Sequence, residues 1–167
     1  MGKRAVEILE RGCIGFSAVL NYIAAALFGV MVVFVAADVI GRYFLSSPIK
    51  GDYEFVEVMT GLVISLSLAY ALVVDQHVRI NILTSRLSPR AQLFSDILTY
   101  FAGLLIFIVA SWQTFIYAGS LRKTGLLIGV LPIPEWPFVY VVAVGFISLT
   151  LVFLIRFIHS LATGGKT

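Results

Sequence analysis

Apolar residues form four long stretches along the chain, separated by short charged segments. The charges leave uncharged gaps at residues 12–37, 58–74, 97–121 and 136–155. About 20 apolar residues in a helix cross a hydrocarbon core of about 30 Å. Helix-start signals at Ser88-Pro89 and Pro134-Glu135 extend two of the gaps toward the N-terminus. The pattern predicts an all-α integral membrane protein with four transmembrane helices, at 12–37, 54–74, 89–121 and 135–158.

The segments outside these spans are short, so residues 1–167 form a single membrane domain. Residues 1–11 predict an amphipathic lead-in, in which Glu7 and Arg11 are spaced to pair on one helical face. Residues 75–88 mix aliphatic and basic side chains and predict an interfacial segment on the cytoplasmic face. The loop 122–134 is unusually apolar, and we expect it to dip into the membrane edge or to lie against another protein.

A signal peptide is an alternative interpretation of the first apolar stretch. Basic residues precede the stretch, and Ala24, Ala25 and Ala26 resemble a cleavage region. The stretch is nevertheless far longer than the roughly 7–15 apolar residues of a signal peptide. We therefore expect a retained transmembrane helix.

Composition and charge agree with a membrane protein. The chain is 60% hydrophobic and 13% charged, whereas soluble chains average about 25% charged residues. The net charge of +3 comes from scattered Lys and Arg, which argues against nucleic-acid binding. A single cysteine, Cys13, excludes an internal disulfide and a Cys-x-x-Cys redox pair.

The distribution of basic residues predicts the orientation. Positive residues favour the cytoplasmic side of short loops. Eight lie on the side of the termini (Lys3, Arg4, Arg11, Arg79, Arg86, Arg90, Arg156 and Lys166), against four on the other side (Arg42, Lys50, Arg122 and Lys123). Both termini are therefore expected in the cytoplasm.

Charged side chains are missing from the middle of every predicted span. The polar residues there are neutral: Ser17, Asn21, Ser65, Ser67, Thr99, Ser111, Gln113 and Thr114. Hydrogen bonding between helices explains them better than a substrate site does. Catalytic motifs and metal-ligand clusters are lacking, and two histidines are too few for a two-haem cytochrome. We expect neither an enzyme nor a cofactor.

Carboxylates gather instead at the ends of the first two spans away from the termini. Asp38 and Arg42 are four residues apart and can pair across one helical turn. Asp52, Glu54 and Glu57 occupy the start of the second span, where a helix N-terminus favours negative charge. A structural role and the docking of a partner both remain open.

Small residues recur at four-residue spacing in the second span, at Gly61, Ser65 and Ala69. Such a column lets another helix approach closely. The approaching helix could belong to this chain or to a partner.

Short motifs at the ends of the spans occur in a distinctive order. They are Arg42-Tyr43-Phe44, Pro48-Ile49, Asp52-Tyr53-Glu54 with Glu57, His77-Val78-Arg79-Ile80, Leu131-Pro132-Ile133-Pro134-Glu135-Trp136 and Gly145. Over residues 14–160 this order resembles the small membrane subunit (DctQ-type) of tripartite ATP-independent periplasmic (TRAP) transporters.

The resemblance implies a scaffold in a bacterial inner membrane. In that family a large permease subunit carries the sodium and substrate sites, and a periplasmic solute-binding protein captures the organic acid. The small subunit braces the permease, and its periplasmic surface helps to dock the binding protein. The resemblance assigns partner contacts to Arg42, Asp52, Glu54, Glu57, Pro132, Pro134, Glu135 and Trp136, and helix packing to Gly61, Ser65 and Ala69.

Two alternatives remain open at this stage. An autonomous exporter acting as a homodimer of four-helix units needs a carboxylate within a span, and Asp38 is the nearest candidate. A haem-bearing membrane anchor would have to use His77 and His159.

Overall fold

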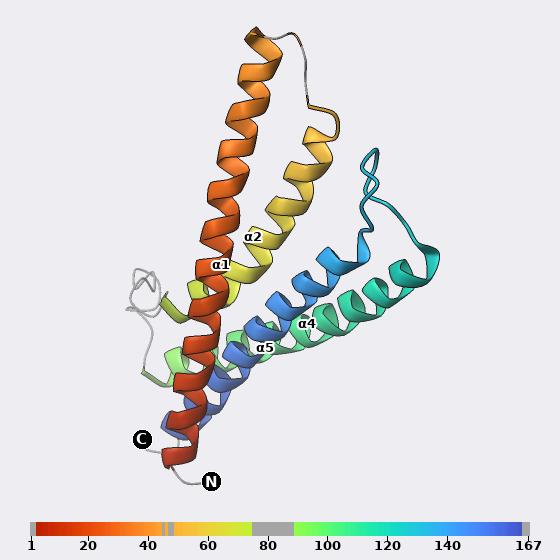
Figure 1. The fold of residues 1–167 in the computed structure, drawn as a ribbon. Helices are drawn as coiled ribbons and strands as arrows, with labels where there is room; N and C mark the ends of the chain where they lie inside the picture. The colour runs from red at the N-terminus through yellow and green to blue at the C-terminus, as the bar shows by residue number, and fades with distance from the viewer. Residues whose placement is uncertain (1–2, 45, 47–48, 75–88, 165–167) are drawn as a thin grey trace.

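The computed structural model describes residues 3–44, 46, 49–74 and 89–164 (Figure 1). They form four helices, α1 (Lys3–Phe44), α2 (Asp52–Val74), α4 (Pro89–Thr124) and α5 (Trp136–Gly164). Each is long and apolar enough to cross a membrane. The predicted class, an all-α membrane protein with four transmembrane helices, is confirmed. The predicted interfacial segment 75–88 lies outside the described residues.

Helix α1 is longer than the span predicted from its uncharged gap. One uninterrupted helix includes residues 3–11, the predicted 12–37 span and the charged positions up to Phe44. The charges do not end the helix, because Asp38 and Arg42 pair four residues apart along it. The uncharged gap therefore marks the apolar part of α1 but not its ends.

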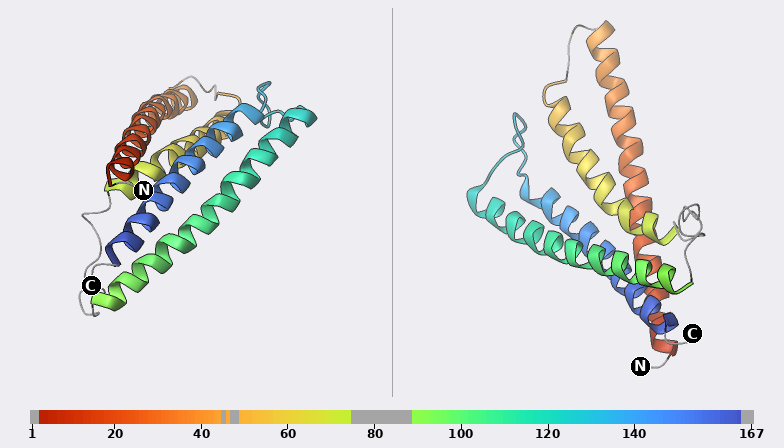
Figure 2. Two further views of the ribbon diagram at one scale, coloured as in Figure 1. Left: turned by 90° about the horizontal axis from the view of Figure 1, so that it is seen from below. Right: turned by 180° about the vertical axis from the view of Figure 1, so that it is seen from behind.

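The helices form two antiparallel hairpins that pack side by side (Figures 1 and 2). Helix α1 pairs with α2 and α4 pairs with α5, while contacts between α2 and α5 join the two hairpins. The order across the layer is therefore α1, α2, α5, α4. The start of α1 and the end of α5 lie at one end of the molecule, which we call the terminal end, and the segments 49–51 and 125–135 lie at the opposite end, the loop end.

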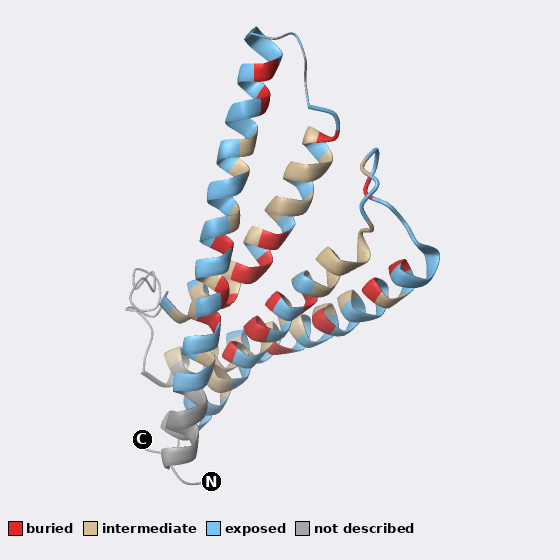
Figure 3. Cartoon of the chain, in the orientation of Figure 1, coloured by how far each residue is buried: buried red, intermediate tan, exposed pale blue. Residues whose placement is uncertain are grey.

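Burial is concentrated where α2 and α5 meet, and α1 and α4 are exposed over most of their surfaces (Figure 3). Leu20 and Ala24 of α1 pack on Leu66 of α2. Leu149 and Val152 of α5 pack on Ala69 of α2. The wide exposed apolar faces of the two outer helices suit a hydrocarbon solvent or a membrane partner.

The closest approach between the hairpins is at Gly145 of α5. A Cβ atom on this buried glycine would lie 2.4 Å from the backbone oxygen of Ser65. Ser65 and Ala69 are 2% and 0% exposed, whereas Gly61 is exposed. Two residues of the predicted small-residue column are therefore packed against α5 of the same chain, whereas Gly61 lies where α2 and α5 are separated by a groove.

Two polar contacts reinforce the packing of α5. The Ser111 hydroxyl of α4 lies 3.2 Å from that of Thr150. At the terminal end, Arg156 Nη2 donates to the backbone oxygen of Val73, 3.2 Å away, in the last turn of α2. A basic side chain at this position satisfies a carbonyl that the helix itself leaves unpaired.

Replacing Gly145 with alanine should destabilise the protein, because the added methyl group overlaps the backbone of α2 and not a flexible side chain. We expect Gly145→Ala to cost about 1–3 kcal/mol and to lower the unfolding temperature in detergent micelles. Gly61→Ala is the matched control, because nothing lies within 4 Å of a Cβ built there. Equal unfolding temperatures for the two variants would refute the close-approach role of Gly145.

Candidate partner-binding surface at the loop end

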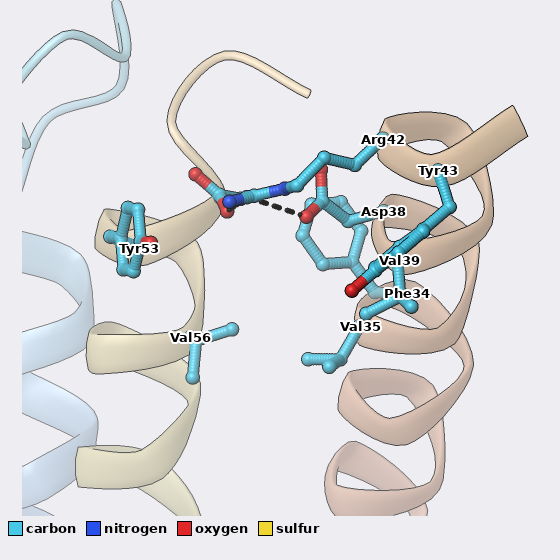
Figure 4. A pocket seen from close by; sticks show the side chains of 9 residues that line it. Phe34, Val35, Asp38, Val39, Arg42, Tyr43, Tyr53 and Val56 are labelled. Atoms are coloured by element: carbon cyan, nitrogen blue, oxygen red, sulfur yellow. Dashed lines mark hydrogen bonds and ion pairs between the residues drawn. The ribbon is translucent and has the colours of Figure 1, made fainter. Parts of the chain in front are cut away.

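Arg42 joins two helices at the loop end through one guanidinium nitrogen (Figure 4). Its Nη2 lies 2.9 Å from Oδ2 of Asp38 on α1 and 2.8 Å from Oδ2 of Asp52 on α2. The other oxygen of Asp38, Oδ1, accepts the backbone N–H of Ile49 at 2.8 Å. The Arg42 network, formed by these four residues, therefore connects α1, Ile49 and α2.

Local sequence explains how the network forms. The four-residue spacing brings Asp38 and Arg42 to one face of α1. Gly51 has φ +82°, a conformation that favours glycine, and its carbonyl accepts the N–H of Phe55 as α2 begins. Asp52 then occupies the first turn of α2, where the helix dipole favours its charge.

Both carboxylate oxygens of Asp38 are engaged within the fold. Asp38 is only 5% exposed, and both of its carboxylate oxygens already have partners in the chain. Across the described ranges, groups of three or more His, Cys, Asp or Glu able to hold a metal ion are lacking as well. The carboxylate that the exporter alternative requires is therefore engaged in holding the fold.

An apolar groove of about 530 Å³ lies directly beneath the network, between α1 and α2 (Figure 4). Its wall is formed largely by Phe34, Val35, Val39 and Val56. The rings of Phe34 and Phe55 pack with their centroids 4.2 Å apart and tie the two helices together nearby. This groove has charge only at its upper rim.

A second groove, between the start of α2 and the start of α5, has an acidic lining. It measures about 430 Å³ and brings together Glu54, Glu57 and Glu135, which come from two separate parts of the sequence. The remaining lining is almost entirely apolar. We call it the acidic groove, and its composition suits a partner segment that carries a basic residue among apolar ones.

The apolar loop before α5 folds back as a small hairpin. Leu127 and Pro134 form an antiparallel bridge, and the N–H of Glu135 donates to the oxygen of Leu126 at 3.1 Å. At the tip, Gly129 has φ +47° and lies so close to Glu54 that a Cβ would come within 2.6 Å of that side chain. The hairpin therefore reaches across to α2 of its own chain.

The base of this hairpin is closed by an aromatic contact. The guanidinium of Arg122, in the last turn of α4, lies 5.5 Å from the ring centroid of Trp136, the first residue of α5. Pro132 is exposed and Pro134 is half-buried. Apolar side chains of the hairpin, including those of Leu127 and Val130, remain open at the surface.

The structure divides the residues expected to contact a partner into three places. Arg42 and Asp52 lie in the network, and their side chains bind each other. The second set, Glu54, Glu57 and Glu135, lines the acidic groove, and the third, Pro132, Pro134 and Trp136, lies in the hairpin and at its base. Sequence reasoning missed the bond between Asp38 and Ile49, because these residues are 11 apart and no helical spacing brings them together.

The neutral polar residues within the spans behave in different ways. Ser17, Ser65 and Ser67 each donate to a backbone oxygen three residues earlier in their own helix. The hydroxyl of Ser111 lies within hydrogen-bonding distance of Thr150 on another helix. Interhelical hydrogen bonding, the expected explanation for the whole set, therefore describes only part of it.

Removing the Arg42 guanidinium should destabilise the loop end more than removing either carboxylate charge. Arg42→Gln leaves Asp38 and Asp52 uncompensated at once, whereas Asp52→Asn removes a single pair. We expect the unfolding temperature to fall in that order, measured in micelles at low ionic strength. An unfolding temperature for Arg42→Gln equal to that of the parent protein would exclude a stabilising role for the network.

A comparison with protein-family models identifies the relatives of the chain. Residues 31–163 match the model described as "Tripartite ATP-independent periplasmic transporters, DctQ component". No match was found among curated proteins or among solved structures. The matched region contains α2, α4, the hairpin, nearly all of α5 and the end of α1 that carries the Arg42 network. The chain therefore belongs to the DctQ component family of tripartite ATP-independent periplasmic transporters.

Proposed function

We propose that this chain is the scaffold subunit of a sodium-coupled organic-acid importer in a bacterial inner membrane. It braces the large permease subunit, and its loop end helps to dock a periplasmic solute-binding protein. The family indicates a small membrane subunit that works with a large permease subunit, and it is a family of transporter components rather than enzymes. The proposal adds the coupling ion, the substrate class, the membrane and the docking role.

The observation that carries the proposal is the engagement of Asp38. The exporter alternative needs a carboxylate within a span that is free to bind a cation or a proton. The carboxylate best placed for this is Asp38, and its two oxygens already accept hydrogen bonds from Arg42 and Ile49. This supports a protein whose spans hold a partner while the partner carries the solute.

The acidic groove supports the docking role. It lies at the loop end, which the distribution of Lys and Arg predicts to be periplasmic. Carboxylates from α2 and from the start of α5 meet there beside apolar side chains, a combination that guides a basic partner surface and fixes its register. The exposed apolar side chains of the hairpin, including Leu127 and Val130, extend the same surface.

Reconstitution tests the division of labour. Vesicles that contain this chain alone should show no sodium-driven uptake of organic acids, because the transport sites lie on the permease. Vesicles that also contain the permease, supplied with the solute-binding protein, should take up solute. Uptake or efflux by the chain alone that is abolished by Asp38→Asn would establish the exporter alternative instead.

Charge reversal tests the acidic groove. We expect Glu54→Lys together with Glu57→Lys to lower transport at least severalfold, because a basic partner segment is repelled. Solute capture by the binding protein should be unchanged. Glu57→Lys alone provides a variant with intact folding, because Glu57 is exposed whereas Glu54 contacts the hairpin.

Lys123→Glu is the matched control, since it reverses an exposed charge at the end of α4 outside the groove. Transport and co-purification with the permease are measured for each variant. Parental values of both for the groove variants would remove the groove from the proposed docking surface.

A further inference from the structure

Helix α4 lies at one edge of the layer, with one face packed and the opposite face open. Its packed face turns Leu104, Ser111 and Ala118 toward α5, its main neighbour. The opposite face carries Ile106, Val109, Gln113 and Ile116, which recur at helical spacing and are all exposed. We call these four residues the Gln113 face.

Gln113 places a polar amide on this apolar face. The residues before and after it in the same row are branched aliphatics, and Ile106 and Val109 are 63% and 62% exposed. Among the described residues, Gln113 is the one Asn or Gln side chain that is exposed, and it makes no hydrogen bond with any of them. Asn21 of α1 is half-buried by comparison.

The amide lies deep in the membrane. Gln113 is nine residues before Arg122, which stands in the last turn of α4, so it lies about 14 Å along the helix from that charge. Half of a hydrocarbon core is about 15 Å. The side chain is therefore near the middle of the bilayer, too far from either headgroup region to reach water.

An amide at that depth needs a protein partner. Its NH₂ group can donate two hydrogen bonds and its oxygen can accept them, whereas acyl chains contain neither donors nor acceptors. Ser17, Ser65 and Ser67 each donate to a carbonyl of their own helix, as Ser65 does to Leu62 at 3.1 Å. Gln113 has no such bond with any described residue. We therefore expect the hydrogen-bonding partner of its amide to belong to another group.

We propose that the Gln113 face is the surface on which a transmembrane helix of the large permease subunit docks. This inference rests on the proposed function, and it assigns the contact to α4 rather than to the equally exposed α1. The Gln113 amide hydrogen-bonds to a neutral polar group at mid-membrane depth, and the aliphatic side chains on either side exclude lipid.

The chemistry of the face specifies the partner helix. The face carries no charge between Asp96 and Arg122, so an ionised group opposite it would remain uncompensated. The expected partner is an apolar helix with one hydroxyl, amide or unpaired backbone group opposite Gln113. Its neighbouring residues are small enough to fit between the branched side chains of Ile106, Val109 and Ile116.

Photo-crosslinking in membranes tests the location. The photoreactive residue benzoylphenylalanine is placed at position 113 or at position 108, in cells that produce the complete transporter. Ile108 is the matched control, because it is also exposed but lies about 140° round the helix from Gln113. We expect an adduct with the permease from position 113 and little or none from position 108.

The outcomes separate this inference from the proposed function. If the parent chain and the permease do not co-purify at all, the scaffold function itself fails. If they co-purify but position 113 yields only an adduct with a second copy of this chain, or only lipid adducts, the assignment of the Gln113 face is wrong and the scaffold function stands. Equal permease adducts from both positions would also overturn the assignment.

A second variant tests the hydrogen bond. Gln113→Leu should weaken association with the permease in lipid nanodiscs about threefold to fifteenfold, the range measured for interhelical hydrogen bonds. The unfolding temperature of the isolated variant should stay level or rise, because leucine suits lipid better than an unpaired amide. Undiminished association, or a lowered unfolding temperature for the isolated chain, would show that Gln113 serves this fold and not the partner.

Discussion

Hydrocarbon cannot hydrogen-bond, and this constraint organises the whole molecule. Asp38 has both of its carboxylate oxygens paired, one with Arg42 and one with the N–H of Ile49. The hydroxyl of Ser111 is matched by that of Thr150 on the next helix. At the end of α2, where a carbonyl would otherwise face lipid, Arg156 supplies a donor. The polar residues thus show which hydrogen bonds form within the chain and which side chains need a partner outside it.

Much of the fold could be predicted because this constraint acts on local sequence. Uncharged stretches identify the spans, and the bounds of α2, from Asp52 to Val74, differ little from the predicted 54–74. The end of α1 was harder to place, because charges usually mark a span boundary. Here the pair Asp38 and Arg42 neutralise each other along the helix, and α1 continues to Phe44.

The arrangement of the site depended on contacts that periodicity does not encode. The small-residue column suggested that a helix approaches Ser65, and Gly145 was visible as a motif, yet their contact follows from how two distant helices cross. The acidic groove likewise depends on a hairpin whose turns require positive φ at Gly125 and Gly129. Long-range approach of this kind is set by the packing of the whole bundle, so sequence spacing alone could not place Glu135 beside Glu54 and Glu57.

The pairing of α2 with α5 has a mechanical consequence. The two helices touch at separate heights, at Ser65 against Gly145 midway and at Val73 against Arg156 near the terminal end, and the hairpin before α5 reaches Glu54 of α2 through Gly129 at the loop end. Two helices joined at a single point can rotate about it, whereas contacts at separated heights restrict both their crossing angle and their rotation. The central pair is therefore expected to keep its geometry, while the outer helices α1 and α4, which are mostly exposed, attach to it.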